Sequence, residues 1–286
     1  TVDNAHENGR SFVLARDGAT MTIDSAELSH LGYEANESYG VAWRLEGTQG
    51  AANNSTFGYN FYGLYLYRAA GLTIRNNTVH HSIRYGIDPH TLSNGLLIEG
   101  NTSHDNGKQG IILAEGCSDS TIRNNTVYNN GLHGIVLFSG SNNNIVEGNV
   151  AYNNTLHGIN INDATGNTLR QNTVYGNGEA GIGVGQDARE NLVQANIVRA
   201  NKRDGIYIFS NARATTLENN VVIGNPRYGI YIKSENNIIG EGNEVTENGV
   251  GLFLNVGTPP TFSRSANRIE RNREADVRSG KSDDGD

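Results

Sequence analysis

Residues 125–137 read Asn-Thr-Val-Tyr-Asn-Asn-Gly-Leu-His-Gly-Ile-Val-Leu, two short apolar segments separated by a turn rich in Asn and Gly. The pattern returns along the chain. The Gly before the second apolar segment recurs every 22 to 24 residues, at Gly40, Gly63, Gly86, Gly110, Gly134, Gly158, Gly181, Gly205, Gly229 and Gly251. An Asn runs in phase with it, at Asn54, Asn77, Asn101, Asn125, Asn149, Asn172, Asn196, Asn220, Asn243 and Asn267. A period in the twenties is typical of a solenoid.

The repeat favours a β-helix over leucine-rich repeats, because it has neither a Leu skeleton nor a helical stretch. Each period contains short β-like segments bounded by Asn and Gly, which tolerate the backbone of sharp corners. Asn side chains stacked at one corner are expected to hydrogen-bond from coil to coil. We predict an all-β fold, a right-handed parallel β-helix of about ten coils with a repeat of about 24 residues.

One domain accounts for the repeat. We predict a single β-helix domain over residues 1–272, in which residues 1–35 form an N-terminal cap and a first partial coil. Residues 273–286 are polar and charged, and we predict that they form a disordered tail without a strand.

Composition limits the possible partners. The formal net charge of −8 over 286 residues argues against nucleic acid, and no apolar run is long enough to span a membrane. The single Cys117 cannot form an internal disulfide. We expect a monomer. The chain starts at Thr1 without a signal-like segment, which we interpret as a mature or trimmed form.

The register of the repeat assigns side chains to faces. Positions one and three residues after each marker Gly are aliphatic and are expected to point inward, so the positions between and before them face outward. The outward columns contain Tyr, His, Asp and Asn, including the candidate binding residues Tyr65, Tyr67, His133, His157 and Asn160. A groove of this kind suits an extended polysaccharide. The alternative is a solvated sheet surface, on which Tyr is common because it favours strands.

The third coil departs from the pattern and reads Tyr85-Gly86-Ile87-Asp88-Pro89-His90. Pro89 replaces an inward aliphatic residue and cannot donate a ladder hydrogen bond, so a local disturbance of the strand is expected. A phenol, a carboxyl group and an imidazole share the outward surface. His90 suits proton abstraction near neutral pH, and Asp88 is placed to orient or tune it.

This segment closely resembles the catalytic signature of mannuronan C5-epimerases. Similar segments occur at Ser11–Leu14, Leu31–Tyr33, Ser38–Val41 and Phe61–Leu64, and also at His104–Gly107 and Gly110–Ile112. The resemblance covers roughly residues 10–180, and the Gly-rich calcium-binding repeat modules of some members are absent. It implies a secreted or periplasmic enzyme that acts on an anionic polysaccharide, alginate or polymannuronate, and inverts C5 of D-mannuronate to give L-guluronate.

The resemblance also implies roles for individual residues. His90 matches the base, Tyr85 the neighbouring acid or proton relay, Asp88 a supporting group and His133 a substrate contact. The chain departs from the family at Glu115 and Thr91. Near the end of the fourth-coil strand the family has an Arg or a carboxyl group that helps to handle the substrate carboxylate. Here the stretch is Ala114-Glu115-Gly116, and Glu115 would have to be protonated, or bridged through a cation, to lie near that carboxylate. The family usually has an acidic residue in place of Thr91. Three basic residues are alternative candidates for neutralising that carboxylate: Arg68, Arg84 and Lys108.

The same residues are compatible with other functions. A uronate lyase shares the proton abstraction but then expels the C4 substituent. A carbohydrate-binding solenoid without catalysis uses the same groove. Glycoside hydrolysis needs a pair of carboxyl groups, and Asp88 and Glu115 are the outward pair evident.

No cofactor is required by the predicted reaction. Asn160, Asn162 and Asp163 offer oxygen ligands for Ca²⁺, although such clusters are common at β-helix corners. His133 and His157 stack one coil apart, but no third zinc ligand is evident, so we interpret them as groove residues.

Overall fold

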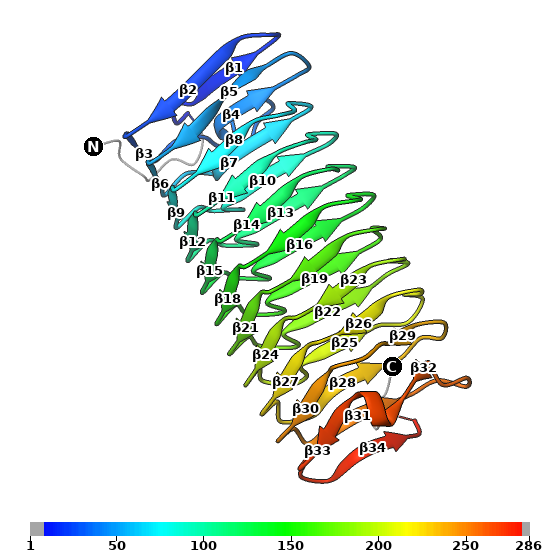
Figure 1. Ribbon diagram of the computed structural model, residues 1–286. Coiled ribbons are helices and arrows are strands. Elements are labelled where there is room, and N and C mark those ends of the chain that lie inside the picture. Colours follow the sequence, from blue (N-terminus) through cyan, green and yellow to red (C-terminus); the bar gives the residue numbers. More distant parts are fainter. Residues whose placement is uncertain (1–8, 282–286) are drawn as a thin grey trace.

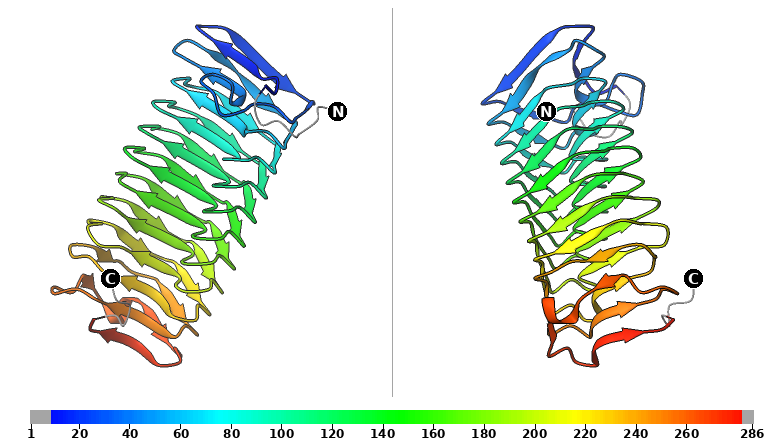
Figure 2. Two further views of the ribbon diagram at one scale, coloured as in Figure 1. Left: turned by 180° about the vertical axis from the view of Figure 1, so that it is seen from behind. Right: turned by 45° about the vertical axis from the view of Figure 1, so that its right-hand side comes forward.

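The computed structural model describes residues 9–281, which form a long stack of parallel coils with the two ends of the chain at opposite ends (Figure 1). Each coil contributes one strand to each of three parallel sheets. Eleven coils carry three strands, and one last strand follows them within the described residues. Figure 2 shows the same stack from behind and from the side.

The first sheet contains twelve strands and bears the outward columns predicted above. Its strands are β1 (Val13–Arg16), β4 (Gly40–Arg44), β7 (Tyr62–Tyr67), β10 (Ile87–His90), β13 (Ile111–Ala114), β16 (Ile135–Phe138), β19 (Ile159–Asn162), β22 (Ile182–Gly185), β25 (Ile206–Ile208), β28 (Tyr228–Ile232), β31 (Val250–Leu254) and β34 (Ala275–Ser279).

The second and third sheets each contain eleven shorter strands. The second has β2 (Thr20–Asp24), β5 (Gln49–Asn53), β8 (Thr73–Arg75), β11 (Leu97–Glu99), β14 (Thr121–Arg123), β17 (Ile145–Glu147), β20 (Thr168–Arg170), β23 (Leu192–Gln194), β26 (Thr216–Glu218), β29 (Ile238–Ile239) and β32 (Thr261–Phe262). The third has β3 (Glu27–Ser29), β6 (Thr56–Gly58), β9 (Thr78–His80), β12 (Thr102–His104), β15 (Thr126–Tyr128), β18 (Val150–Tyr152), β21 (Thr173–Tyr175), β24 (Ile197–Arg199), β27 (Val221–Ile223), β30 (Glu244–Thr246) and β33 (Arg268–Glu270).

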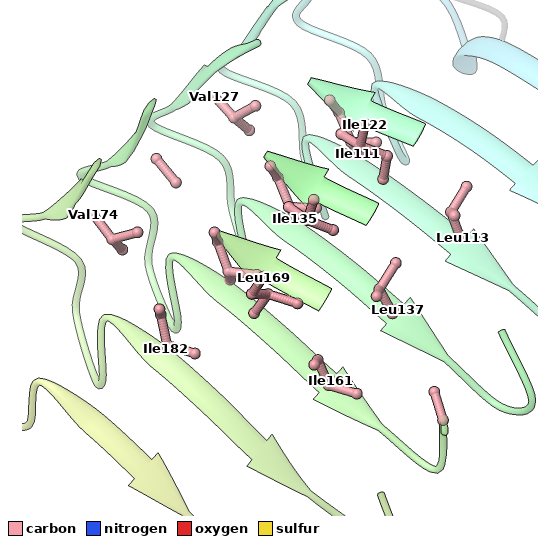
Figure 3. Close-up of a cluster of buried hydrophobic side chains, with 14 of the residues drawn as sticks. Ile111, Leu113, Ile122, Val127, Ile135, Leu137, Ile161, Leu169, Val174 and Ile182 are labelled. Carbon is pink, nitrogen blue, oxygen red and sulfur yellow. The ribbon is translucent and has the colours of Figure 1, made fainter. Parts of the chain in front are cut away.

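The core is the interior of the coils. In the first sheet, the residues one and three positions after each marker Gly point inward, as Ile111 and Leu113 do, and both are fully buried. Each strand of the other two sheets adds its middle residue, such as Ile122 and Val127. Figure 3 shows these side chains as columns that run from coil to coil. The predicted alternation of inward and outward positions is confirmed.

The Asn residues form ladders inside the corners. From Asn77 to Asn267, each side-chain amide donates to the Oδ1 of the Asn in the next coil, for example from Asn101 to Asn125 at 2.9 Å. This confirms the predicted ladder, except that Asn54 is exposed and Ser55 takes its place. A second ladder, from Asn106 to Asn272, lies at the corner before the first sheet.

The marker Gly residues are required for space. A Cβ on Gly110 would lie 2.3 Å from a methyl group of Val127 and 2.7 Å from the amide nitrogen of Asn130. These two residues belong to the third sheet and to its corner Asn ladder. Each marker Gly therefore recurs in phase with an Asn of the second ladder, because the two share the corner before the first sheet.

Both predictions for the ends need correction. Residues 1–35 contain three strands, β1 to β3, which form a complete first coil instead of a partial one. The predicted tail contains β34, which pairs with β31 and places Val277 beside the inward Leu252, so that the core continues into this strand. The predicted cap residues 1–8 and tail residues 282–286 lie outside the described part of the chain.

The helical content is one short 3₁₀ segment, η1 (Arg264–Ala266), within residues 9–281. In that part of the chain, no helix has the length and apolar character needed to cross a membrane.

Candidate active site

A cavity of about 250 Å³ opens on the outward face of the first sheet, across β10, β13, β16 and β19. It contains six of the predicted residues together with others from the same outward columns. The lining residues are Tyr85, Asp88, His90, Gln109, Ile112, Ala114, Glu115, His133, Val136, Phe138, Asn160 and Asn162. The cavity lies where the repeat is broken.

Pro89 causes that break. It occupies an inward position of β10 and is buried. Strand β10 pairs with β7 at four positions, but with β13 only at Ile87 and His90. The missing pairs follow from the absent N–H of proline. The predicted disturbance of the strand is confirmed, and Asp88 and His90 remain on the outward side that lines the cavity.

Asp88 is the most unusual group in the cavity. Its residue is 1% exposed, and neither carboxyl oxygen has a hydrogen-bond partner among the described residues. Burial, reinforced by the nearby charge of Glu115, raises the pKa of Asp88 well above its ordinary value, against a smaller opposing effect of Lys108. Burial therefore favours the neutral form of Asp88, which has a proton to donate into the cavity.

Two further polar atoms in the same lining are buried without a partner in the described chain, Oε1 of Gln109 and Oδ1 of Asn160. Buried polar groups in folded proteins nearly always have partners, so three unpartnered residues around one cavity need an explanation. A bound polar ligand provides one. Gln109 was not among the predicted site residues, although its column, shared with Tyr85 and His133, was identified.

His90 belongs to a short hydrogen-bonded relay. Its Nδ1 lies 2.8 Å from the Thr91 hydroxyl, which donates to Oε2 of Glu115 at 2.8 Å. Because that hydroxyl gives its only proton to Glu115, it accepts from Nδ1–H of His90. The lone pair of the neutral imidazole is then on Nε2. Burial lowers the pKa of His90, with Glu115 acting in the opposite direction, so the ring is neutral near pH 7.

Thr91 has a backbone conformation that its side chain disfavours. Its φ of +37° lies in the left-handed region, where a β-branched residue is an outlier. The same corner is left-handed in other coils, at Arg68, Glu115 and Ser139, so this conformation belongs to the corner of the solenoid. A threonine suits this position because its hydroxyl bridges His90 and Glu115.

Tyr85 lines the cavity before β10. Its ring lies 5.6 Å from that of Tyr62, and the Nζ of Lys108 lies 5.1 Å from its centre. Burial raises the pKa of Tyr85, and the nearby Asp88 acts in the same direction. The phenol is therefore protonated and is a donor.

His133 and His157 are stacked at 5.1 Å and share a tautomer. The Nδ1 of His133 accepts from the backbone N–H of His157, and the Nδ1 of His157 accepts from that of Ala180, both at 3.2 Å. Burial lowers the pKa of His133 to about 3 and that of His157 to about 4. Both rings are neutral at physiological pH and present Nε2–H donors. His157 belongs to a neighbouring cavity.

The predicted basic residues do not line the cavity. Arg68 stacks on Tyr67 and borders a separate cavity, and Arg84 pairs with Glu34 at 2.8 Å. Lys108 stays at the rim, over Tyr85. The lining, all of it within residues 9–281, therefore contains no Lys or Arg.

Two predicted aromatic residues flank the cavity on β7. Tyr65 is paired with Asp88 and its ring lies 6.1 Å from His90, while Tyr67 is paired with His90. Asn162 and Phe138 line the cavity although they were not among the substrate-binding candidates. Their position, four residues after a marker Gly, is the signal that identifies them.

For metals, no group of three or more His, Cys, Asp and Glu residues in the described part of the chain is arranged to bind an ion. Of the three residues considered for Ca²⁺, Asn160 and Asn162 line the cavity, while Asp163 does not. The prediction that the reaction requires no cofactor stays a prediction.

Comparison with known proteins first defines the class. The family model described as "Right handed beta helix region" matches residues 3–111, 39–198 and 112–273. The chain belongs to this family, and the predicted right-handed parallel β-helix is confirmed.

Within this class, the chain is similar to mannuronan C5-epimerases. The enzyme from Pseudomonas fluorescens is 36% identical over 98 residues, which cover 30% of this chain and 18% of the relative. That from Pseudomonas aeruginosa is 33% identical over 96 residues, with the same coverage. The resemblance seen in the sequence is confirmed, although the matched segment spans less than a fifth of these relatives.

Solved structures extend the likeness over most of the chain. A double mutant of the periplasmic alginate epimerase AlgG matches 94% of this chain and 62% of its own, with a TM-score of 0.68 and 26% identity. The A-module of the Azotobacter vinelandii mannuronan C-5 epimerase AlgE6 covers 93% of this chain and 91% of its own, with a TM-score of 0.51. Its 15% identity shows a shared fold alone.

Proposed function

We propose that this chain is a polysaccharide-modifying enzyme that epimerises D-mannuronate to L-guluronate at C5 within polymannuronate or alginate. The observation that carries the proposal is one cavity with a neutral imidazole, His90, and an unpartnered, buried carboxyl group, Asp88. The named relatives and the AlgG structure support the same class of reaction.

The first requirement of the reaction is to neutralise the substrate carboxylate, which acidifies the proton on C5. With no Lys or Arg in the lining, the proton of Asp88 supplies this by hydrogen bonding to a carboxylate oxygen. The amides of Gln109 and Asn160 and the Nε2–H of His133 are further polar groups for the sugar. Asp88 is thus given the part that the basic candidates were expected to play.

The proton transfers follow from the protonation states. Nε2 of His90 takes the proton from C5, and the electron pair of the broken C–H bond moves into the carboxyl group of the substrate. Thr91 and Glu115 orient the imidazole and stabilise the imidazolium that forms. Tyr85 then returns a proton to C5 from the opposite face, either directly or through water. The sugar is inverted without redox change or loss of a group.

The proposal also covers the cellular location and the partner of the protein. A structural neighbour is a periplasmic alginate epimerase, which supports a periplasmic or secreted location for this chain. The proposed partner is an anionic polysaccharide.

The test is to incubate the protein with polymannuronate in D₂O and record proton NMR spectra. Guluronate signals and deuterium at C5 support the proposal. Ultraviolet absorbance from unsaturated chain ends identifies β-elimination instead, in which the C5 carbanion expels the C4 substituent. Binding of the polymer without either signal favours the non-catalytic carbohydrate-binding solenoid.

His90→Ala is the decisive variant, since it removes the proposed base without touching the core. We expect turnover to fall by about 10³-fold or more, with an unchanged circular dichroism spectrum. His81→Ala is the matched control, because His81 is exposed outside the cavity. Near wild-type turnover of His90→Ala refutes the assignment of the base.

A further inference from the structure

A second cavity, of about 220 Å³, lies on the same face of the first sheet, further toward the C-terminus. It spans the turn before β22 and the strands β25 and β28 with their preceding turns. Its charged lining residues are Glu179, Arg203, Asp204, Arg227 and Lys233. None of these was a site candidate from the sequence.

Aromatic rings connect the two cavities. His133 lines the first cavity and stacks on His157, which lines the second. The ring of His157 meets Phe209 edge-on at 5.5 Å, and Phe209 lies 3.8 Å from Tyr207. Tyr207 in turn stacks on Tyr231 at 4.5 Å. The two cavities therefore adjoin at the stacked His133 and His157, and the rings continue along the sheet from His157 as a track that belongs to the second cavity.

Two Gly residues make this track possible. Gly183 and Gly185 occupy the outward positions of β22, where other coils have a side chain. A Cβ on Gly185 would lie 2.8 Å from Phe209, and one on Gly183 would lie 3.2 Å from the same ring. The missing side chains let Phe209 lie across β22, so that this coil contributes a flat apolar floor.

The two cavities differ in charge. The second is lined by three cations, Arg203, Arg227 and Lys233, and by two carboxylates, Glu179 and Asp204, which gives a net charge of +1. The first has two carboxyl groups and no cation. Asp204 is buried and accepts hydrogen bonds from the Arg227 guanidinium and the Tyr228 N–H, so its negative charge is compensated within the protein.

The two cavities adjoin, but the distance from His90 to the cations of the second cavity suits a polymer. Five coil steps lead from β10 to β25, which corresponds to about 24 Å at the spacing of parallel strands. This distance is several sugar residues along an extended chain. A trisaccharide held at His90 is too short to span it.

We infer that the second cavity is a distal binding site for a carboxylate-bearing sugar of the same polymer, with the ring track forming an apolar floor for the sugars that enter it. The substrate class rests on the proposed function, whereas the site itself rests on the cavity, its cations and the track. Cations and N–H donors favour a carboxylate, and the rings favour the apolar faces of sugars.

Binding measurements test the site independently of turnover. We expect the double variant Arg203→Ala, Lys233→Ala to bind polymannuronate about tenfold more weakly than the wild type, the loss expected for one or two charge-assisted contacts. Affinity electrophoresis or calorimetry with the whole protein gives this ratio. Arg199→Ala is the matched control, because Arg199 stacks on Tyr175 in the third sheet, away from the groove.

The length of the substrate provides the second readout. Turnover of a mannuronate trisaccharide should be unchanged in the double variant, while KM for the polymer rises. If the double variant loses secondary structure by circular dichroism, the single variant Arg203→Gln, at an exposed residue, replaces it.

Equal binding of polymannuronate by the double variant and the wild type overturns the inference. Equal binding of neutral mannan and polymannuronate by the wild type also overturns it. If the wild type binds polymannuronate in a manner that depends on Arg203 and Lys233 but never converts it, the distal site stands and only the proposed reaction fails.

Discussion

Two buried aspartates on the same sheet face differ in their surroundings. Asp204 is 1% exposed and is bound by Arg227 and a backbone N–H, which is the usual state of a buried carboxylate. Asp88 is also 1% exposed but has no partner in the described chain. A group that lowers stability without a structural partner is typical of a functional site. At the scale of the residue, Asp88 is what separates this coil from its neighbours.

The first prediction concerns the stability that the protein loses by burying Asp88. Its pKa is raised in the folded state, so between about pH 3.8 and the folded pKa the native protein holds a proton that the unfolded chain has lost. Stability therefore falls with rising pH across that window, by about 1.4 kcal/mol per pH unit from this group. Asp88→Asn cannot ionise, so its melting temperature should exceed that of the wild type at pH 7 and match it near pH 3.

Asp204→Asn is the control for this prediction. It breaks the ion pair with Arg227 and should lower the melting temperature at pH 7. A lowered melting temperature for Asp88→Asn at pH 7 contradicts the view that Asp88 is an uncompensated buried acid.

The second prediction concerns the relay of Thr91. Thr91→Val keeps the branched shape but removes the hydroxyl between His90 and Glu115, so the imidazole loses its orienting partner. We expect kcat to fall about tenfold to a hundredfold, with little change in KM. Initial rates on polymannuronate measure it, and Thr91→Ser should restore most of the activity. An unchanged kcat for Thr91→Val excludes the relay.

The third prediction concerns the acid limb of the pH profile. Burial lowers the pKa of His90 below 6.5, and the base works only in its neutral form. As the pH falls, kcat/KM should therefore decline with a midpoint below 6.5, because protonation removes the lone pair of Nε2. Rates measured from pH 4 to 8 locate the midpoint. A midpoint well above 6.5 is incompatible with a desolvated His90.

At the scale of the element, corners and strands are stabilised by different side-chain interactions. The Asn ladders close the corners by joining each side chain to the next coil and to a backbone carbonyl, as Asn125 does with Asn149 and Ile98. On the outer face of the second sheet, Arg and Glu alternate from coil to coil, as at Arg123 and Glu99. The ladders are buried and the charge pairs are exposed, so their contributions to stability should differ.

The fourth prediction compares the two. Asn125→Ala removes the side chain's hydrogen bonds and leaves buried partners unsatisfied, so we expect a loss of roughly 2–4 kcal/mol in the free energy of unfolding. Arg123→Ala in the same coil breaks a surface ion pair and should cost about 1 kcal/mol or less. Urea unfolding curves give both values. Equal losses for the two variants refute a special role of the ladder.

At the scale of the whole molecule, the strands of each coil pair only with those of the neighbouring coils among the described residues. The central coils have a neighbouring coil on both sides. The last coils have shorter strands in the second sheet, where β29 and β32 have two residues each. Solenoid stability is approximately a sum over such neighbour contacts. Local opening should therefore be easiest toward the C-terminal end.

The fifth prediction follows from this gradient. In hydrogen exchange measured by mass spectrometry, peptides that contain β29 and β32 should exchange at least tenfold faster than those that contain β14 and β17. The central coils, which contain the strands of the candidate active site and the Asn ladders, should be the most protected from hydrogen exchange. Uniform exchange along the stack would show that the solenoid opens as one unit.

The sequence alone determined the architecture, because a parallel β-helix is built from local repeats. Gly, Asn and aliphatic residues recur in phase, and that phase sets the corners, the inward columns and the coil spacing. It also identified Asp88-Pro89-His90 as the place where the repeat fails. It missed β34, since a final strand without marker residues has no periodic signal.

Only the tertiary structure decided which side chains are buried and which groups they contact. That Asp88 is buried without a partner, that Thr91 links His90 to Glu115, and that Arg68 and Arg84 lie elsewhere depend on neighbouring coils. The register assigns a side chain to a face, but burial and partners depend on what the adjacent coils place beside it. For that reason the second cavity, in which the ring of Phe209 lies across the two Gly residues of β22, became evident only in the folded chain.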